Sequence, residues 1–184
     1  MILNDRIILG IDPGSQIMGF GVIVAESNKL RMLEMGVVNL KKIEDHFERM
    51  AHILDTTLAL IDKYKPTELA IEAPFQGKNV QSMLKLGRAQ GVAIAAGLHR
   101  KVDIFEYAPR KIKMAITGKG EATKEEVARL LQRMLGFAEI PHNLDATDGL
   151  AAAVCHFYQR TVVDVSPKAK NWKEFMANNP GRVK

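Results

Sequence analysis

The sequence contains one cysteine in 184 residues and no long run of apolar side chains. Cys155 cannot form an internal disulfide, and no cysteine and histidine have the spacing of zinc ligands, which excludes a disulfide scaffold and a zinc finger. No stretch reaches the roughly 18 apolar residues of a membrane span, and the N-terminus lacks the basic and apolar segments of a secretory signal. We therefore expect a cytoplasmic protein that folds around an ordinary hydrophobic core.

Charge is distributed unevenly along the chain. The net charge is +5, but residues 74–134 hold 12 basic and 5 acidic side chains, whereas residues 1–73 hold 8 and 11. A basic central segment favours a polyanionic partner, of which nucleic acid is the commonest. The same lysines and arginines are equally compatible with ordinary solvated helix faces, so charge alone leaves both interpretations open.

The spacing of apolar residues predicts an α/β domain. Short runs rich in β-branched residues indicate strands, and apolar residues three and four apart indicate amphipathic helices. The first three strands form an antiparallel meander, and a strand-helix-strand crossover then adds a parallel strand. We expect one domain over residues 1–160 and a basic, loosely ordered tail over 161–184. The predicted strands are 7–12, 17–24, 30–40, 69–72 and 102–107, and the predicted helices are 44–64, 81–100, 108–117, 123–136 and one that begins near 145.

Several glycines fall inside these predicted elements. Gly19 and Gly21 lie two apart on one strand face, which predicts the close approach of a neighbouring helix or of a ligand. Gly87, Gly91 and Gly97 lie inside the second predicted helix, where each lowers helix stability by roughly 1 kcal/mol relative to Ala. Because these glycines lower the stability of the helix, we predict that another segment packs tightly against it.

Four carboxylates have positions that suit a metal site. Asp12 and Glu72 each end a short apolar strand, and the carboxyl ends of parallel strands meet at one edge of a sheet. Asp145 and Asp148 are three residues apart and share one face of the last predicted helix. Such oxygen ligands suit Mg²⁺, and two ions in one site can drive phosphodiester hydrolysis. The alternative without a metal is a helix N-cap at Asp145, a dipole partner at Asp148 and locally hydrogen-bonded strand acids.

Six short motifs follow one another along the chain: Gly10–Ser15, Ala70–Glu72, Lys78–Asn79, Leu84–Ala93, Phe105–Arg110 and Asp145–Ala151. Together they resemble the RuvC family of bacterial Holliday-junction resolvases over about residues 7–158. The resemblance implies a ribonuclease H-like fold, a five-stranded mixed sheet flanked by helices, that acts as a homodimer. The second predicted helix is the first candidate for the dimer contact, although another helix could serve instead. In that family, the acids that match the four carboxylates above bind Mg²⁺ or Mn²⁺ and carry out strand cleavage.

The resemblance also implies roles for basic and aromatic residues. Lys113 and Lys124 match family lysines that lie near the DNA backbone at the active site, where they would stabilise developing charge. Phe75 matches an aromatic residue that stacks on an unpaired base at the centre of the junction. The alternative for Phe75 is a core position that caps its strand. The further candidates for phosphate contacts are Lys78, Lys85, Arg88, Arg110, Lys111 and Lys119.

These features predict a dimeric, Mg²⁺-dependent endonuclease that resolves four-way junction DNA in recombination and repair. It would nick two strands at symmetric positions and leave 5′-phosphate and 3′-hydroxyl ends. The resemblance further implies coupling to the RuvA–RuvB branch-migration complex.

Three alternatives are left open. The first is a ribonuclease H-like nuclease with another nucleic-acid substrate, and the second is a junction-binding protein without catalytic activity. The third is an ATPase of the actin-like or sugar-kinase type, because Gly10–Ser15 also resembles the first phosphate loop of those proteins. Such an ATPase needs two domains of this kind, for which 184 residues leave no room.

Overall fold

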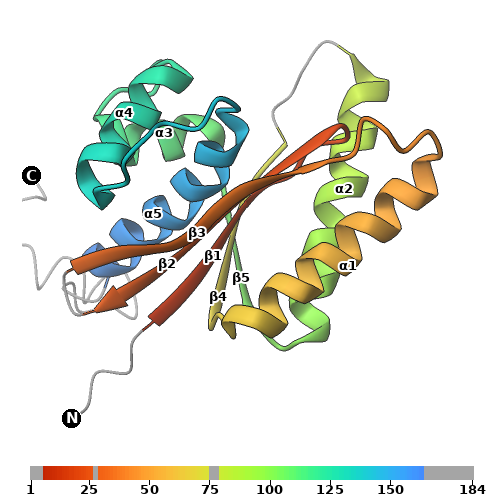
Figure 1. Cartoon of the computed structure of the whole chain (residues 1–184), viewed down its shortest axis with the longest axis horizontal. Coiled ribbons are helices and arrows are strands. Elements are labelled where there is room, and N and C mark those ends of the chain that lie inside the picture. The colour runs from red at the N-terminus through yellow and green to blue at the C-terminus, as the bar shows by residue number, and fades with distance from the viewer. Residues whose placement is uncertain (1–5, 27–28, 75–78, 164–184) are drawn as a thin grey trace, which may run out of the picture.

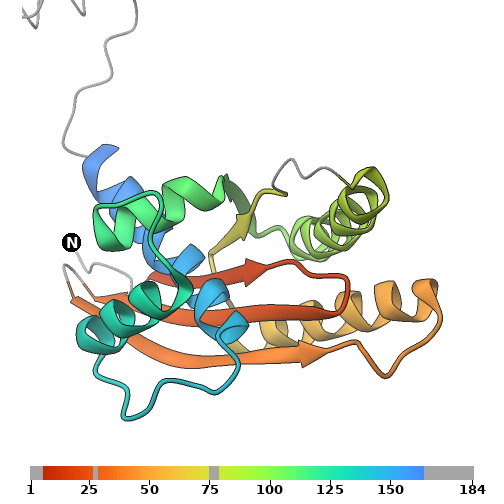
Figure 2. The same cartoon turned by 90° about the horizontal axis from the view of Figure 1, so that it is seen from above.

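The computed structural model describes residues 6–26, 29–74 and 79–163. These ranges form the strands β1 (Arg6–Asp12), β2 (Ile17–Glu26), β3 (Lys29–Asn39), β4 (Glu68–Glu72) and β5 (Asp103–Tyr107), and the helices α1 (His46–Tyr64), α2 (Val80–His99), α3 (Pro109–Thr117), α4 (Lys124–Leu135) and α5 (Asp145–Val163). The helices α1 and α2 lie on one side of the sheet, and α3, α4 and α5 lie on the other (Figures 1 and 2). Of the second group, α5 packs directly on the strands, and α3 and α4 pack against α5.

The sheet has the strand order β3-β2-β1-β4-β5. β1 runs antiparallel to β2, and β2 antiparallel to β3, which is the predicted meander. β4 pairs in parallel with β1, and β5 pairs in parallel with β4. The predicted five-stranded mixed sheet flanked by helices is therefore confirmed. Because β1 and β4 are parallel neighbours, their carboxyl ends lie at the same edge of the sheet.

Local signals set the ends of two of the helices. The side chain of Asp45 accepts hydrogen bonds from two backbone amides in the first turn of α1, and the helix is followed by Lys65, a C-cap residue with a left-handed conformation (φ 51°). α4 begins with the predicted capping box, in which Thr123 and Glu126 bond to each other's backbone amides. Both helices thus begin and end close to the predicted positions.

The strand β1 is buried on both faces, as its apolar run predicts. Leu9 and Ile11 pack in a cluster with residues of α1 and α2, whereas Ile8 packs in a second cluster with residues of α5. Side chains alternate between the two faces of a strand, so Asp12 lies on the same face as Ile8. The acid at the end of β1 is thereby directed toward α5.

Glycines let α5 approach the sheet closely. A Cβ atom at Gly19 would lie 1.8 Å from the carbonyl oxygen of Asp145, and one at Gly21 would lie 2.4 Å from the Cα of Leu150. The close approach predicted at these two glycines is confirmed, and the approaching element is a helix.

The helix α5 continues to Val163. It therefore extends past the predicted domain boundary at residue 160. The remainder of the predicted tail, residues 164–184, lies outside the described ranges. No helix in the described part of the chain is both long enough and apolar enough to cross a membrane.

The three glycines of α2 have different surroundings. A Cβ atom at Gly97 would lie 2.6 Å from Cδ1 of Ile104, whereas one at Gly87 or Gly91 would meet nothing within 4 Å. Tight packing is thus confirmed at Gly97, whereas for Gly87 and Gly91 it stays a prediction, because no described residue of the chain fills the space there.

A buried polar chain connects β4 and β5 to α5. Arg6 donates a hydrogen bond to Oε2 of Glu68 at 2.9 Å, and Nε2 of His156 lies 3.3 Å from the same oxygen. The hydroxyl of Tyr107 lies 2.6 Å from Nδ1 of His156. Burial by itself would raise the pKa of Glu68, but the interactions with His156 and Arg6 outweigh it and lower this pKa to about 2. Since Tyr107 is the register partner of Glu72, these polar contacts link the end of β5 beside Glu72 to α5.

Candidate active site

Asp12 and Glu72 lie next to each other where β1 and β4 end. The two strands pair up to Ile11 and Ile71, so the next residue on each strand is one of the two acids. Both acids are on the face of the sheet that α5 covers, because each alternates with an isoleucine that points to the opposite face. The two residues line the same two cavities, as the crossover predicts.

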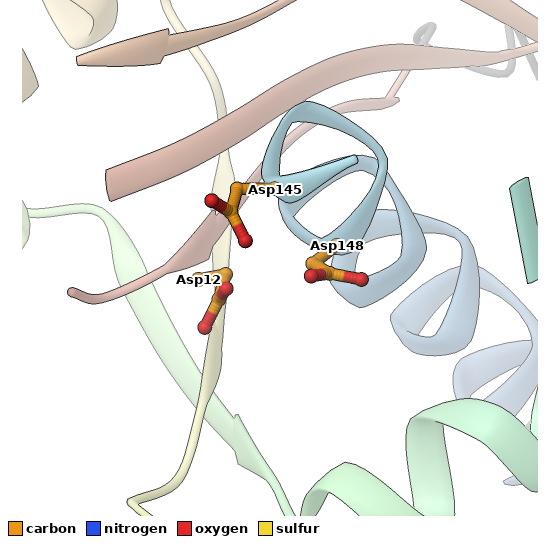
Figure 3. A group of neighbouring side chains, drawn as sticks. All are labelled: Asp12, Asp145 and Asp148. Atoms are coloured by element: carbon orange, nitrogen blue, oxygen red, sulfur yellow. The ribbon is translucent and has the colours of Figure 1, made fainter. Parts of the chain in front are cut away.

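The first turn of α5 brings Asp145 and Asp148 to this edge. The side-chain oxygen of Asn143 accepts a hydrogen bond from the Asp145 amide at 3.0 Å, so Asn143 and not Asp145 caps the helix. Figure 3 shows the two aspartates of α5 beside Asp12. One carboxylate oxygen from each of these three residues lies within 4.8 Å of the other two. Asn143 is missed by the motif pattern, although an Asn shortly before the first helical residue is a capping signal.

A cavity of about 560 Å³ joins these acids to basic side chains of α3 and α4. A second cavity of about 270 Å³ shares Asp12 and Glu72 with the first and is also lined by Asp145 and Leu86. An acidic centre beside a basic wall suits a phosphodiester, whose oxygens need positive partners. The charged residues that line the larger cavity are Asp12, Glu72, Arg110, Lys113, Glu121, Lys124 and Asp148.

Crowding and burial raise the pKa values of the acids. Burial raises the pKa of Asp12 well above its usual value, and the charges of Glu72 and Asp148 add to this. Burial and the charge of Asp148 raise the pKa of Glu72 to about 7. Burial also raises the pKa of Asp148, although Lys124 opposes the shift. A bound cation would relieve this repulsion, so the electrostatics of the site favour one.

Lys124 supplies a positive charge within this acid group. Its Nζ donates a hydrogen bond to Oδ1 of Asp145 at 2.8 Å and another to Oδ2 of Asp148. The positive charge of Lys124 thus lies between two of the carboxylates. Together with the three convergent carboxylate oxygens, this arrangement fits a hard divalent cation, for which oxygen ligands are preferred.

Two of the predicted DNA contacts lie on α2 and two fall just before it. Lys85 and Arg88 are exposed on the first half of this helix. Phe75 and Lys78 lie outside the described ranges. The roles of all four residues stay predictions.

The remaining predicted contacts lie on α3 and the loop that follows it. Arg110 lines the larger cavity, with its Nε 3.6 Å from Oε1 of Glu121. Nζ of Lys111 lies 5.2 Å from the centre of the Tyr107 ring. Lys119 does not line the acid cavity but a separate one of about 200 Å³. The basic residues of α3 are therefore not all directed to one place.

Metal binding at this site is expected to strengthen as the pH rises from about 6 to about 8. Glu72 is not one of the three grouped carboxylates, but with its pKa of about 7 it would have to lose its proton to act as the predicted fourth ligand, so protons would compete with the metal at lower pH. Titration calorimetry with MnCl₂, in two buffers that differ in ionisation enthalpy, measures the protons released. We expect proton release near pH 6.5 that falls in the Glu72→Gln variant. Affinity and proton release that are independent of pH would contradict this assignment.

Comparison with protein families gives a match over most of the chain. Residues 8–156 match the family model described as "Crossover junction endodeoxyribonuclease RuvC". A protein of that description from Christiangramia forsetii is 55% identical over 184 residues, which cover 100% of this chain and 96% of the relative. Another from Bacteroides fragilis is 56% identical over 184 residues, which cover 99% of this chain and 98% of the relative.

Solved structures show the same fold. The structure of T. thermophilus RuvC in complex with Holliday junction substrate has a TM-score of 0.79 at 33% identity and covers 85% of this chain and 96% of that one. The yeast mitochondrial Holliday junction resolvase has a TM-score of 0.62 at 15% identity and covers 86% of this chain and 80% of that one. At the latter identity, the likeness shows the fold alone.

Proposed function

The chain belongs to the RuvC family of crossover junction endodeoxyribonucleases, and we propose that it resolves Holliday junctions by nicking two strands at symmetric positions. It has the ribonuclease H-like fold of a metal-dependent family of nucleases that act in DNA recombination and repair. The observation that carries the proposal is the convergence of Asp12, Asp145 and Asp148 at one edge of the sheet, in a chain that matches this family over most of its length.

The relative solved with a Holliday junction supports junction DNA as the substrate. That relative is 33% identical to this chain, and the match covers 85% of this chain. The basic residues beside the acid cavity provide partners for phosphates. A junction has two-fold symmetry, so two equivalent nicks separate it into two duplexes with 5′-phosphate and 3′-hydroxyl ends.

The four carboxylates would hold two Mg²⁺ ions, for which Mn²⁺ can substitute. When bound, these ions supply the Lewis acidity that activates a water and stabilises the departing oxygen in phosphodiester hydrolysis. Asp12 is the best candidate for the ligand shared by both ions, because it interacts electrostatically with the other three acids. Lys113 and Lys124 line the same cavity, where their ammonium groups would neutralise charge that develops on the phosphate.

Basic residues flank the acidic edge on two sides. α2 follows the end of β4, and α3 follows the end of β5 directly, so both helices begin near the edge that carries the acids. We infer that the DNA backbone crosses this edge between the two helices. Phe75 would stack on an unpaired base beside it. The residues proposed to contact phosphates are Lys78, Lys85, Arg88, Arg110, Lys111, Lys113, Lys119 and Lys124.

A homodimer would place two such sites on one two-fold substrate. The exposed face of α2 supports this helix as the contact. Leu84 and Leu98 are 51% and 62% exposed. Gly87 and Gly91 lie between them at helical spacing, and a Cβ atom at either would meet nothing within 4 Å. Exposed leucines beside glycines form a surface that a second α2 helix can approach closely.

Replacing Leu84 with Glu is therefore expected to shift the protein from dimer to monomer. A charge at the centre of an apolar contact is left without a partner when the two copies associate. Sedimentation equilibrium measures the mass of the particle. The matched control is Met134→Glu on α4, which changes an exposed apolar residue, at 36%, on the other side of the sheet from α2. A dimer that persists in Leu84→Glu would rule out this face as the contact.

The function itself is tested by incubating the purified chain with a labelled four-way junction or a linear duplex, each with and without Mg²⁺. Paired nicks are expected on the junction alone, and only when Mg²⁺ is present. Cleavage of the duplex as well would favour a nuclease with a broader substrate. Junction binding without cleavage in any divalent metal would favour a scaffold, and ATP turnover without DNA would favour the kinase-like alternative.

Two further proposals follow from family membership. We propose that the chain acts together with the RuvA–RuvB branch-migration complex, and that it works in the cytoplasm, where a bacterial chromosome is located. Binding of the chain to a junction already loaded with the branch-migration proteins tests the first of these.

A further inference from the structure

The positive charge of Lys124 is unfavourable at its position in α4. It is the first residue of α4, where a positive charge opposes the helix dipole, whereas the following Glu125 and Glu126 agree with the dipole. Its side chain instead reaches α5, where Nζ contacts Oδ1 of Asp145 at 2.8 Å and also Oδ2 of Asp148. A residue that violates a local preference while making a contact between elements points to a function for that contact.

The contact of Lys124 competes with the binding of a cation. Asp145 and Asp148 belong to the group of three residues whose carboxylate oxygens converge within 4.8 Å. An ammonium bonded to both residues occupies lone pairs that a divalent cation would need, and it also repels a second positive charge at close range. The ion pairs of Lys124 and the binding of metal to these oxygens therefore compete with each other.

The side chain of Lys124 can move away from the two aspartates without disturbing the fold. Its side chain is 49% exposed, whereas that of Asp148 is 15% exposed. Four methylene groups give it a long flexible reach, and the capping box of Thr123 and Glu126 holds the backbone of the helix start independently of the ammonium. Displacement therefore needs only rotations of the lysine side chain.

We propose that Lys124 is an internal counter-ion that holds the place of a divalent cation between Asp145 and Asp148 in the metal-free enzyme and is displaced when metal binds. The displaced ammonium would stay in the cavity that it shares with Lys113, where we propose that the phosphate binds. Metal loading thus makes Lys124 available to DNA, and the acid group is never left without a cation. This inference rests on the proposed function, because it assumes that these acids bind a metal ion.

The first test is a calorimetric titration of the full chain with MnCl₂ in the absence of DNA. Lys124→Met is expected to raise the affinity for Mn²⁺ by about tenfold, because no ammonium must be displaced. The matched control is Lys113→Met, which removes the same charge from the same cavity. Within the described ranges, Lys113 forms no ion pair with these acids, so this change breaks none. Its effect is expected to be much smaller. Equal effects of the two changes would show general charge repulsion and overturn the proposal.

The second test uses the unchanged protein, so it does not depend on the folding of any variant. Reductive methylation followed by mass spectrometry measures how accessible each lysine amine is. Methylation of Lys124 is expected to become several-fold faster when MgCl₂ is added, whereas that of exposed Lys85 should not change. A rate for Lys124 that stays constant or falls on metal addition would overturn the proposal. Junction nicking that persists in that case leaves the proposed function intact, whereas the absence of metal binding and of nicking would contradict both.

Discussion

Replacing Asp148 with Asn is expected to abolish junction nicking while junction binding persists. Asp148 is the more enclosed of the two acids of α5, with its side chain 15% exposed compared with 28% for Asp145. The amide has nearly the same shape as the carboxylate, so packing at the start of α5 is kept, but the negative charge that we propose holds the metal is lost. Because the metal supplies the chemistry of the cleavage step, we expect the rate to fall by at least about 10²- to 10³-fold.

Single-turnover cleavage of a labelled four-way junction in Mg²⁺ measures this loss, and a gel-shift assay in Ca²⁺ measures binding. The matched control is Asp55→Asn, which makes the same chemical change at an exposed position of α1. That variant should cleave at the normal rate. Full activity of Asp148→Asn would remove Asp148 from the catalytic group, and a parallel loss of binding would indicate that the change had disturbed the fold.

Replacing Gly149 with Ala is expected to destabilise the protein and to weaken metal binding. A Cβ atom at this position would lie 2.5 Å from the Cα of Phe20 and 2.6 Å from the carbonyl carbon of Gly19. These are backbone atoms of β2, which cannot rotate away as a side chain can. The start of α5 must therefore move outward, and the free energy of unfolding should fall by about 3 kcal/mol, or roughly 10 °C in Tm. Asp148, the preceding residue, would move with it.

Thermal unfolding and a Mn²⁺ titration measure the two effects of Gly149→Ala. The matched control is Gly87→Ala on α2, where the added Cβ would meet nothing within 4 Å. Both changes are compared in the Leu84→Glu background, so that association of two copies does not contribute. Gly87→Ala should raise stability by about 0.5–1 kcal/mol, since Ala is the better helix former. Equal stability of the two variants would show that the contact between α5 and β2 is looser than the geometry indicates.

Much of the fold and of the site could be predicted from the sequence, because the deciding signals are local. The apolar run before Asp12 and the 3-and-4 spacing in α1 each depend on a few neighbouring residues. The capping box of Thr123 and Glu126 is equally local. The crossover from β3 through α1 to β4 adds one general rule, that such a connection places strands parallel in one sheet, and this rule predicts Asp12 and Glu72 at the same edge.

Other features depend on contacts between segments that are far apart in the chain. Local spacing places Asp145 and Asp148 on one helix face, but it cannot show that Asn143 provides the cap or how closely α5 approaches Asp12. It predicts tight packing at the α2 glycine Gly91 but cannot show which segment packs there, and no described residue lies within 4 Å of a Cβ atom at this position.

The sequence by itself thus determined most of the elements and singled out the four acids as candidates, because these follow from periodicity and from the residues that end each element. Only the tertiary structure decided how the acids meet and what balances their charge. The glycines on β1, β2 and α5 set the depth at which Asp145 and Asp148 approach Asp12. The ammonium of Lys124 crosses from α4 to reach the two acids of α5. These outcomes depend on backbone contacts and charges brought together by folding, and no local pattern in the chain encodes those distances.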